Sequence, residues 1–216
     1  VDVESALAAR QLKPVHVARF ALGVTNLEEE LKAAKAAGAN VIFSYTVGYE
    51  NAVIAKGRKA LGWAVPQVGA WPLSFTFFLD GAKEAADGAL MAQTFIAEPS
   101  NERRASFLVS YARRNQVKKI PVPMAAAQGY DAAYLLVYSL FGIRSGNIAG
   151  PAIKASLENL QRVYYGVVAT YEHPFSLQDK DAITANMLVM GMVKNGAITF
   201  AYPEDAKRNL FVKRKQ

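Results

Sequence analysis

The sequence predicts an α/β fold built on doubly wound parallel sheets, and three patterns carry that prediction. Short apolar runs, rich in β-branched and aromatic residues, alternate with helical patterns between residues 27 and 95. Gly38 and Gly62 end two of the helical patterns directly before such runs. Strands separated by helices form parallel sheets. We therefore expect about four parallel strands in the first half of the chain.

The elements of this first half are expected in the following order. Residues 2–12 have the apolar spacing of a helix, and the alternation VHVARF at 15–20 predicts a strand near a sheet edge. Thr25 and Glu28 have the spacing of a capping box for the next helix. The remaining elements are a helix at 27–37, a strand at 40–45, a helix at 49–61, a strand at 66–71, a less regular helix at 75–85 and a strand at 88–95.

After residue 99 the pattern changes to helices, which we expect at 101–114, 124–141 and 151–160. The helix at 124–141 is apolar on most sides, so it should be covered on most sides. Strand patterns return at 166–171 and at 187–201, where Asn195-Gly196 predicts a two-residue hairpin turn.

The helical block has no strands of its own to pack on, and the chain opens inside a helix. We therefore expect a fold that is incomplete at its N-terminus, with one central strand missing beside 15–20. The length of 216 residues allows one large domain or two small ones.

The composition limits the kinds of partner that the chain is expected to bind. The net charge is +7, but the basic pairs at 103–104, 113–114 and 118–119 lie on or just after an amphipathic helix, which is typical of a solvated face. We expect no nucleic-acid partner. No apolar run is long enough to span a bilayer, so direct membrane insertion is not expected. No signal peptide is recognisable, which leaves an intracellular protein or one whose leader has been removed.

Motifs for catalysis or cofactor binding are absent from the sequence. There is no phosphate-binding loop, no dinucleotide fingerprint and no nucleophile elbow. The chain has no cysteine, and His16 and His173 are its only histidines, without a nearby pair of carboxylates. We expect no metal site, no cofactor and no catalytic residue. An enzyme on a doubly wound sheet stays open as a less favoured alternative.

A ligand site is predicted where two neighbouring parallel strands end, because ligands bind at the carboxyl ends of such strands. The candidate binding residues are Tyr45, Thr46, Val47 and Gly48 in one loop and Trp71 and Pro72 in the other. The aromatic rings offer a large apolar surface. The backbone N–H groups of the turn at 48–50 begin a helix, which favours an anionic group there. In the alternative interpretation, Tyr45 and Trp71 only pack against the end of the sheet.

Six stretches resemble the type I periplasmic solute-binding proteins, and within them the branched-chain amino-acid (leucine, isoleucine, valine) binding family of ABC importers. They run in order through nearly the whole chain: AAGANVIFSYTVGYENAVIAKGRKALGW, VPQVGAW, QTFIAEPS, AAAQGYDAAYLL, IKASLENLQRVYYGVVATYEHPF and GMVKNGAITFAYPEDAKRNL.

The resemblance implies the type I periplasmic-binding-protein fold, with two α/β lobes joined by three crossings and the ligand held between them. It implies that residues 1–99 belong to the C-terminal lobe and that the helices within 100–184 belong to the N-terminal lobe. Residues 185–216 then return to the C-terminal lobe and form a tail. By this resemblance, the sheet of the N-terminal lobe and a leader are expected to lie outside this chain.

The function implied is the extracytoplasmic, periplasmic solute-binding component of an ABC importer. Its ligand would be a small-molecule carboxylate (an aromatic or branched apolar acid, or a branched-chain amino acid), and its partner an ABC permease in the membrane. Amino-acid-binding members place an acidic residue in the second loop, where this chain has Trp71. An aromatic or branched apolar carboxylate is therefore expected to fit better than a plain α-amino acid, whose ammonium would lack a partner. A ligand-sensing domain of a receptor or regulator with the same fold is the alternative.

Overall fold

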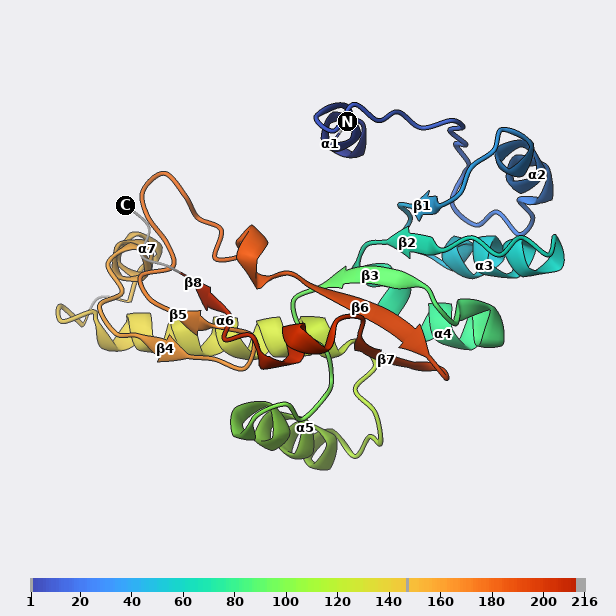
Figure 1. Cartoon of the computed structure of the whole chain (residues 1–216). Helices are drawn as coiled ribbons and strands as arrows, with labels where there is room; N and C mark the ends of the chain where they lie inside the picture. Colours follow the sequence, from blue (N-terminus) through green and yellow to red (C-terminus); the bar gives the residue numbers. More distant parts are fainter. Residues whose placement is uncertain (1, 147, 213–216) are drawn as a thin grey trace. The chain divides into compact units, whose positions relative to one another are not determined.

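The computed structural model describes residues 2–146 and 148–212 (Figure 1). The chain divides into two compact units. The first comprises the residues up to Met91 together with Met192–Ala197, and the second comprises Ala92–Gly191 together with the residues from Ile198 onward. Each unit is described by itself.

The first unit carries parallel strands separated by helices, as the sequence predicts. Strands β1 (Ile42–Ser44), β2 (Gln67–Gly69) and β3 (Leu90–Gln93) pair in parallel, with Phe43 opposite Val68 and Val68 opposite Leu90. The helices are α1 (Asp2–Ala8), α2 (Glu28–Ala36), α3 (Glu50–Ala60) and α4 (Thr76–Ala82), with the short 3-10 helices η1 (Trp71–Ser74) and η2 (Lys83–Ala86).

The larger sheet has the strand order β1-β2-β3-β6-β7. Its last two strands, β6 (Val189–Lys194) and β7 (Ala197–Phe200), are joined by the predicted two-residue turn. Asn195 and Gly196 have φ angles of 52° and 71°. A type I′ hairpin turn requires positive φ at both positions, so the prediction from Asn-Gly is confirmed.

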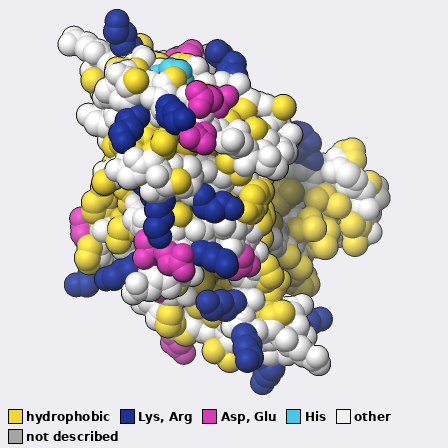
Figure 2. Space-filling model, turned by 90° about the vertical axis from the view of Figure 1, so that its right-hand side faces the viewer, with side chains coloured by type: hydrophobic (Ala, Val, Ile, Leu, Met, Phe, Trp, Pro, Cys, Tyr) yellow, Lys and Arg dark blue, Asp and Glu magenta, His cyan; other side chains and the backbone are white. Residues whose placement is uncertain are grey.

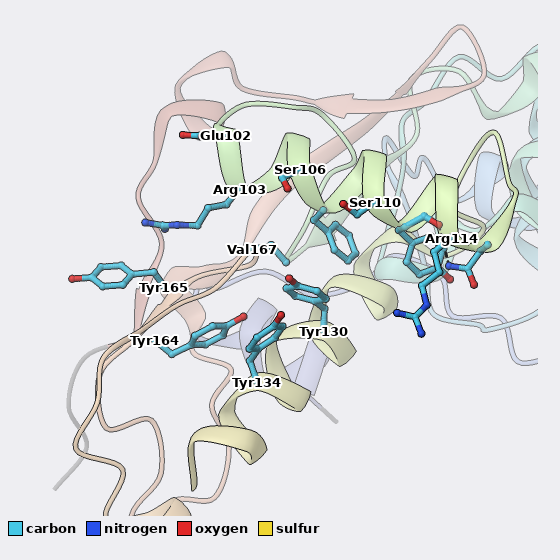
Figure 3. A pocket seen from close by; sticks show the side chains of 13 residues that line it. Glu102, Arg103, Ser106, Ser110, Arg114, Tyr130, Tyr134, Tyr164, Tyr165 and Val167 are labelled. Atoms are coloured by element: carbon cyan, nitrogen blue, oxygen red, sulfur yellow. Dashed lines mark hydrogen bonds between the residues drawn. The ribbon is translucent and has the colours of Figure 1, made fainter. Parts of the chain in front are cut away.

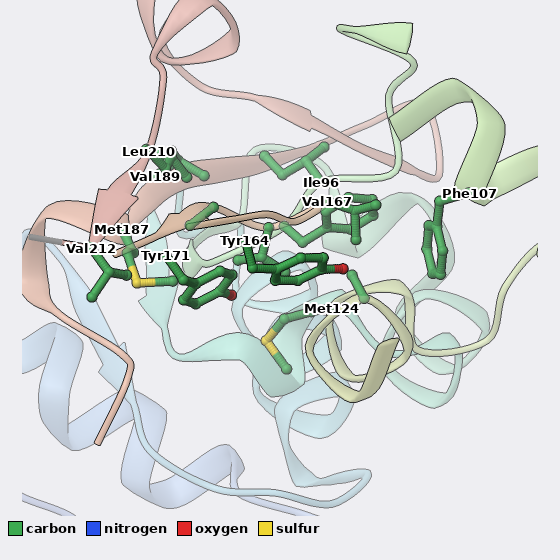
Figure 4. Close-up of a cluster of buried hydrophobic side chains, with 14 of the residues drawn as sticks. Ile96, Phe107, Met124, Tyr164, Val167, Tyr171, Met187, Val189, Leu210 and Val212 are labelled. Carbon is green, nitrogen blue, oxygen red and sulfur yellow. The ribbon is translucent and has the colours of Figure 1, made fainter. Parts of the chain in front are cut away.

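The second unit combines three helices with a small sheet. The helices are α5 (Glu102–Asn115), α6 (Pro123–Phe141) and α7 (Gly150–Glu158). The sheet has the order β4-β5-β8, formed by β4 (Tyr164–Tyr165), β5 (Thr170–Tyr171) and β8 (Phe211–Val212). Figure 4 shows the core of the second unit, in which Met124 from α6 lies with Tyr164, Tyr171, Val189 and Val212.

A buried carboxylate holds this second core together. Asp131 of α6 is only 1% exposed, and its oxygens accept four hydrogen bonds. The donors are the backbone N–H groups of Val167 and Val168, at 2.8 and 2.9 Å, and the hydroxyls of Tyr164 and Tyr171, at 3.2 and 3.1 Å. Burial raises the pKa of the Asp131 carboxyl, and the four donors act in the opposite direction.

The same carboxylate explains why Gly166 precedes those donors. A Cβ atom on Gly166 would lie 2.4 Å from Oδ2 of Asp131, which is closer than real Cβ contacts allow. Any side chain at this position would push the connection between β4 and β5 away from α6. The positions of Asp131 and Gly166 therefore depend on each other, although the two residues are far apart in the sequence.

Several expectations from the sequence are wrong in detail. Residues 15–20 form no strand, although they alternate, because no neighbouring strand supplies the backbone hydrogen bonds that a strand needs. Thr25 forms no capping box, since the side chain of Asn26 accepts the hydrogen bond from the Glu28 N–H at 2.9 Å instead. The strand expected at 66–71 ends at Gly69, because Pro72 has no N–H to donate to a ladder and Trp71 begins η1.

The expectation that the helix at 124–141 is covered on most sides is also wrong. Helix α6 buries Met124, Ala127 and Leu135, but its opposite side is not covered within the described residues, and Phe141 is 80% exposed. Lys and Arg side chains are dispersed over the face in view in Figure 2, with Asp and Glu among them. No helix in the described part of the chain combines the length and the apolar character that crossing a membrane requires.

Replacing Asp131 with Asn should lower the free energy of unfolding by about 2–4 kcal/mol, because an amide nitrogen would face buried donors. Urea denaturation followed by circular dichroism would measure the change. Asp87→Asn, at an exposed position, is the matched control and should change the free energy by less than about 0.5 kcal/mol. Equal stability of the two variants would show that Asp131 does not hold the second core together.

Candidate functional site

The two predicted loops leave the same edge of the parallel sheet. Ser44, the last residue of β1, lies opposite Gly69, the last residue of β2. The first loop, residues 45–48, follows Ser44, and the second begins η1 with Trp71 and Pro72. Parallel pairing in this register places the start of both loops side by side. A Cβ atom on Gly69 would lie 2.7 Å from the Ser44 carbonyl oxygen, so only glycine allows this approach.

The aromatic side chains of these loops are exposed. Tyr45 is 81% exposed, Trp71 is 48% exposed and Val47 is also exposed, whereas Pro72 is buried. A side chain as exposed as Tyr45 does not pack against the end of the sheet, whereas Trp71 is half-buried. The strand ends thus carry apolar surface that a ligand could cover.

A residue that sequence reasoning missed, Glu50, fills the anionic position at the start of α3. Its side chain is 3% exposed, and Oε1 accepts the Gly23 N–H at 2.6 Å while Oε2 accepts the Thr46 hydroxyl at 3.1 Å. The N–H groups of Glu50 itself and of Gly48 also donate to this carboxylate. The donors, led by the Gly23 N–H, lower the pKa of Glu50.

The expectation that these N–H groups bind an anionic ligand is therefore wrong, because the protein supplies the anion itself. Gly48 has a structural role here: a Cβ atom at this position would lie 2.2 Å from Oε2 of Glu50. The sequence did hold a signal, since an acidic residue in the first turn of a helix complements its dipole. The Thr46 hydroxyl donates to Glu50, so a ligand could meet it only as a hydrogen-bond acceptor, and its ligand-binding role stays a prediction.

A chain of amides connects the two strands beneath the loops. The side chain of Gln67 donates to the Ser44 hydroxyl at 3.2 Å and to the Asn51 carbonyl at 3.3 Å, and Asn51 donates to the Thr46 carbonyl at 3.1 Å. Within the described residues, Oδ1 of Asn51 and Oε1 of Gln67 are buried acceptors without a partner. Such acceptors are normally satisfied by a donor such as a bound water.

The histidines lie in irregular segments. His16 lies in the unpaired stretch before α2, and His173 has a φ of 49° in the loop after β5. No three histidine, aspartate or glutamate side chains of the described residues come close enough to hold a metal ion.

Glu50→Gln should lower the free energy of unfolding at neutral pH, because the amide loses one acceptor and the anionic charge. Since the folded-state pKa of Glu50 is lowered, its contribution is present above its unfolded pKa of about 4.3 and is lost as the pH falls through the folded pKa. The difference between wild type and variant should therefore shrink in acid. Urea denaturation at pH values from about 7 to about 3 measures it, with the exposed Glu84→Gln as control. A difference that stays constant with pH would contradict this role.

No curated protein matches the chain. A type 1 periplasmic binding protein from Bordetella pertussis Tohama I matches with 21% identity and a TM-score of 0.74, over 92% of this chain and 55% of that chain. A leucine-binding protein from Thermotoga maritima matches with 22% identity and a TM-score of 0.70, over 86% of this chain and 51% of that one.

A third solved structure is an ABC transporter solute-binding protein from R. palustris in complex with benzoate, with 16% identity and a TM-score of 0.70. The match covers 92% of this chain and 52% of the chain of that protein. The chain thus spans about half the length of the solved structures it matches, and at these identities the likeness shows the fold. The sequence model of one family, described as periplasmic binding protein, matches residues 1–197. Because this match covers most of the sequence and agrees with the fold, the chain belongs to the periplasmic binding protein family.

Proposed function

We propose that this chain is part of the solute-binding component of an ABC importer and that it captures a small carboxylate with an aromatic or branched apolar body. The observation that carries this proposal is the exposed pair Tyr45 and Trp71 at adjacent strand ends of a chain that belongs to the periplasmic binding protein family. Capture needs only a difference in affinity between conformations, so it requires no catalytic group.

The loops favour a ligand without an ammonium group. None of the six candidate residues, Tyr45 to Gly48 with Trp71 and Pro72, is acidic. The carboxylate that follows the first loop in sequence, Glu50, is buried and already accepts hydrogen bonds from Gly23 and Thr46. An α-ammonium group would therefore lose its hydration without gaining a counter-charge, which is costly. The benzoate complex of the R. palustris protein is an example of an amine-free ligand in a related fold.

We assign the apolar wall of the site to this first unit. By the family resemblance, hydroxyls and N–H groups of the N-terminal lobe hold the ligand carboxylate, and Thr46 is occupied by Glu50. The division into a C-terminal lobe at 1–99, N-terminal-lobe helices at 100–184 and a return at 185–216 is part of this proposal. So are a periplasmic location and an ABC permease as the membrane partner.

Trp71→Ala should weaken ligand binding about tenfold to a hundredfold, because the loss of a stacked indole costs about 1–3 kcal/mol. Isothermal titration calorimetry of the protein with benzoate, leucine, isoleucine and valine would measure this. Tyr202→Ala, which removes an exposed tyrosine of the second unit, is the control and should leave affinity unchanged. Tight binding of the three amino acids without binding of benzoate would reject the amine-free ligand, and unchanged affinity in Trp71→Ala would reject the site.

A further inference from the structure

We call the proposed site at residues 45–48 with Trp71 and Pro72 the strand-end site. The second unit contains a cavity that has no part in it. It has a volume of about 560 Å³ and lies between α5, α6 and the segment around β4 (Figure 3). We call it the α5–α6 cavity. Its walls are one face of α5, two tyrosines of α6 and the segment 164–167, and the lining residues are Glu102, Arg103, Ser106, Phe107, Ser110, Tyr111, Arg114, Asn115, Tyr130, Tyr134, Tyr164, Tyr165 and Val167.

Aromatic rings form a continuous wall of this cavity. The ring of Tyr134 stacks on that of Tyr164, with centroids 5.6 Å apart and planes 12° from parallel. Tyr130 lies 4.9 Å from Tyr134 and 5.1 Å from Phe107. Figure 3 shows the rings of Tyr130, Tyr134 and Tyr164 beside one another. The hydroxyl of Tyr164 donates to the buried Asp131, and this hydrogen bond fixes the position of the Tyr164 ring in the wall.

The same wall presents hydroxyl groups that stay protonated at neutral pH. The hydrogen bond with Tyr134, followed by burial, raises the pKa of Tyr130 to about 12. Burial also raises the pKa of Tyr164 well above its ordinary value. The proton of Tyr164 is donated to Asp131, so the hydroxyls that remain for a ligand are those of the Tyr130–Tyr134 pair and, on the opposite wall, of Ser106 and Ser110.

Arginines lie near the two ends of the cavity. Arg103 and Arg114 are eleven positions apart on α5, which corresponds to roughly 16 Å along the helix axis. The guanidinium of Arg103 lies 5.0 Å from the ring centroid of Tyr165. Among residues 2–146 and 148–212, neither Arg103 nor Arg114 forms a salt bridge. Their positive charge is thus not neutralised by the protein.

One acidic residue distinguishes the two ends. Glu102 lines the cavity beside Arg103, whereas Arg114 is accompanied by the neutral Asn115. An anion therefore meets the less compensated positive charge at the Arg114 end. The aromatic wall of Tyr130 and Tyr134 is available to the body of a ligand whose acid group is held there.

We propose that the α5–α6 cavity binds an elongated aromatic carboxylate, with its acid group at Arg114 and Asn115 and its rings on Tyr130 and Tyr134. Arginine binds carboxylates through paired donors, and aromatic rings stack on tyrosine with little loss of entropy. The volume lies within the range of about 300–1,000 Å³ that is typical of small-molecule sites, and it holds more than a single ring.

The probes are biphenyl-4-carboxylate, biphenyl-4,4′-dicarboxylate and the neutral 4-hydroxymethylbiphenyl, each titrated calorimetrically into the protein. We expect the two anions to bind and the neutral analogue to bind at least about tenfold more weakly. Arg114→Gln should weaken the anions about tenfold or more, whereas Arg113→Gln should change affinity by less than about twofold. Arg113 is exposed, lies on the same helix and does not line the cavity.

A second variant tests the cavity itself. Ser110→Trp places a large ring in the cavity from an exposed position, and it should abolish binding while the thermal unfolding of the protein remains unchanged. Glu102→Gln should raise the affinity for the dicarboxylate. Absence of binding, equal binding of the neutral analogue, or equal losses in the Arg113 and Arg114 variants would overturn the assignment.

Two further variants separate this site from the strand-end site. Trp71→Ala and Tyr45→Ala should leave biphenyl carboxylate binding unchanged, since both residues belong to the first unit. A loss of binding in these variants, without a loss in Arg114→Gln, would place the ligand at the strand ends. That result would refute the α5–α6 cavity as a site and would support the proposed function.

Discussion

The structure depends on one constraint: a carboxylate removed from water must be met by hydrogen-bond donors. Two of the buried carboxylates, one in each unit, meet it chiefly with backbone N–H groups and hydroxyls. Asp131 receives four donors in the second unit, and Glu50 receives Gly23, Thr46 and the start of α3 in the first. Each carboxylate connects segments that are distant in sequence, and a glycine lies against each, Gly166 and Gly48, where a side chain would clash. The loops of both units are therefore held by charge-assisted hydrogen bonds as well as by apolar packing.

This arrangement decides what the strand-end site can recognise. Because Glu50 occupies the N–H groups at the start of α3, those groups cannot bind a ligand anion, and Thr46 is used to orient Glu50. What the first unit exposes at the ends of β1 and β2 is the apolar surface of Tyr45, Val47 and Trp71. In the proposed function, this unit contributes affinity through buried area and stacking, so it would select for the body of a ligand rather than its charge. The α5–α6 cavity differs, since it combines aromatic walls with uncompensated arginines.

The sequence predicted the features that are set locally. Helix–strand alternation identified the parallel strands, and Asn195-Gly196 identified the hairpin, because positive φ angles are encoded by the residues themselves. Prediction from the sequence failed where a partner that is distant in the sequence determines the structure. Residues 15–20 alternate like a strand, but a strand exists only with a neighbour to pair with. The donors to Asp131 lie 33 to 40 positions further along the chain, and the Gly23 donor lies 27 positions before Glu50, so these donors could not be recognised from local spacing. The loops were placed correctly at one sheet edge, whereas their ligand-binding role stays a prediction.

The central claim is that a ligand covers Trp71 at the strand ends, and tryptophan fluorescence tests it most directly. The chain has two tryptophans, and Trp63 is buried while Trp71 is half exposed. In a Trp63→Phe variant, emission reports on Trp71 alone. Titration with benzoate should change this emission saturably and should protect Trp71 from quenching by acrylamide. If benzoate binds by calorimetry but leaves both the emission and the quenching of Trp71 unchanged, the ligand lies elsewhere and the assignment of the strand-end site is contradicted.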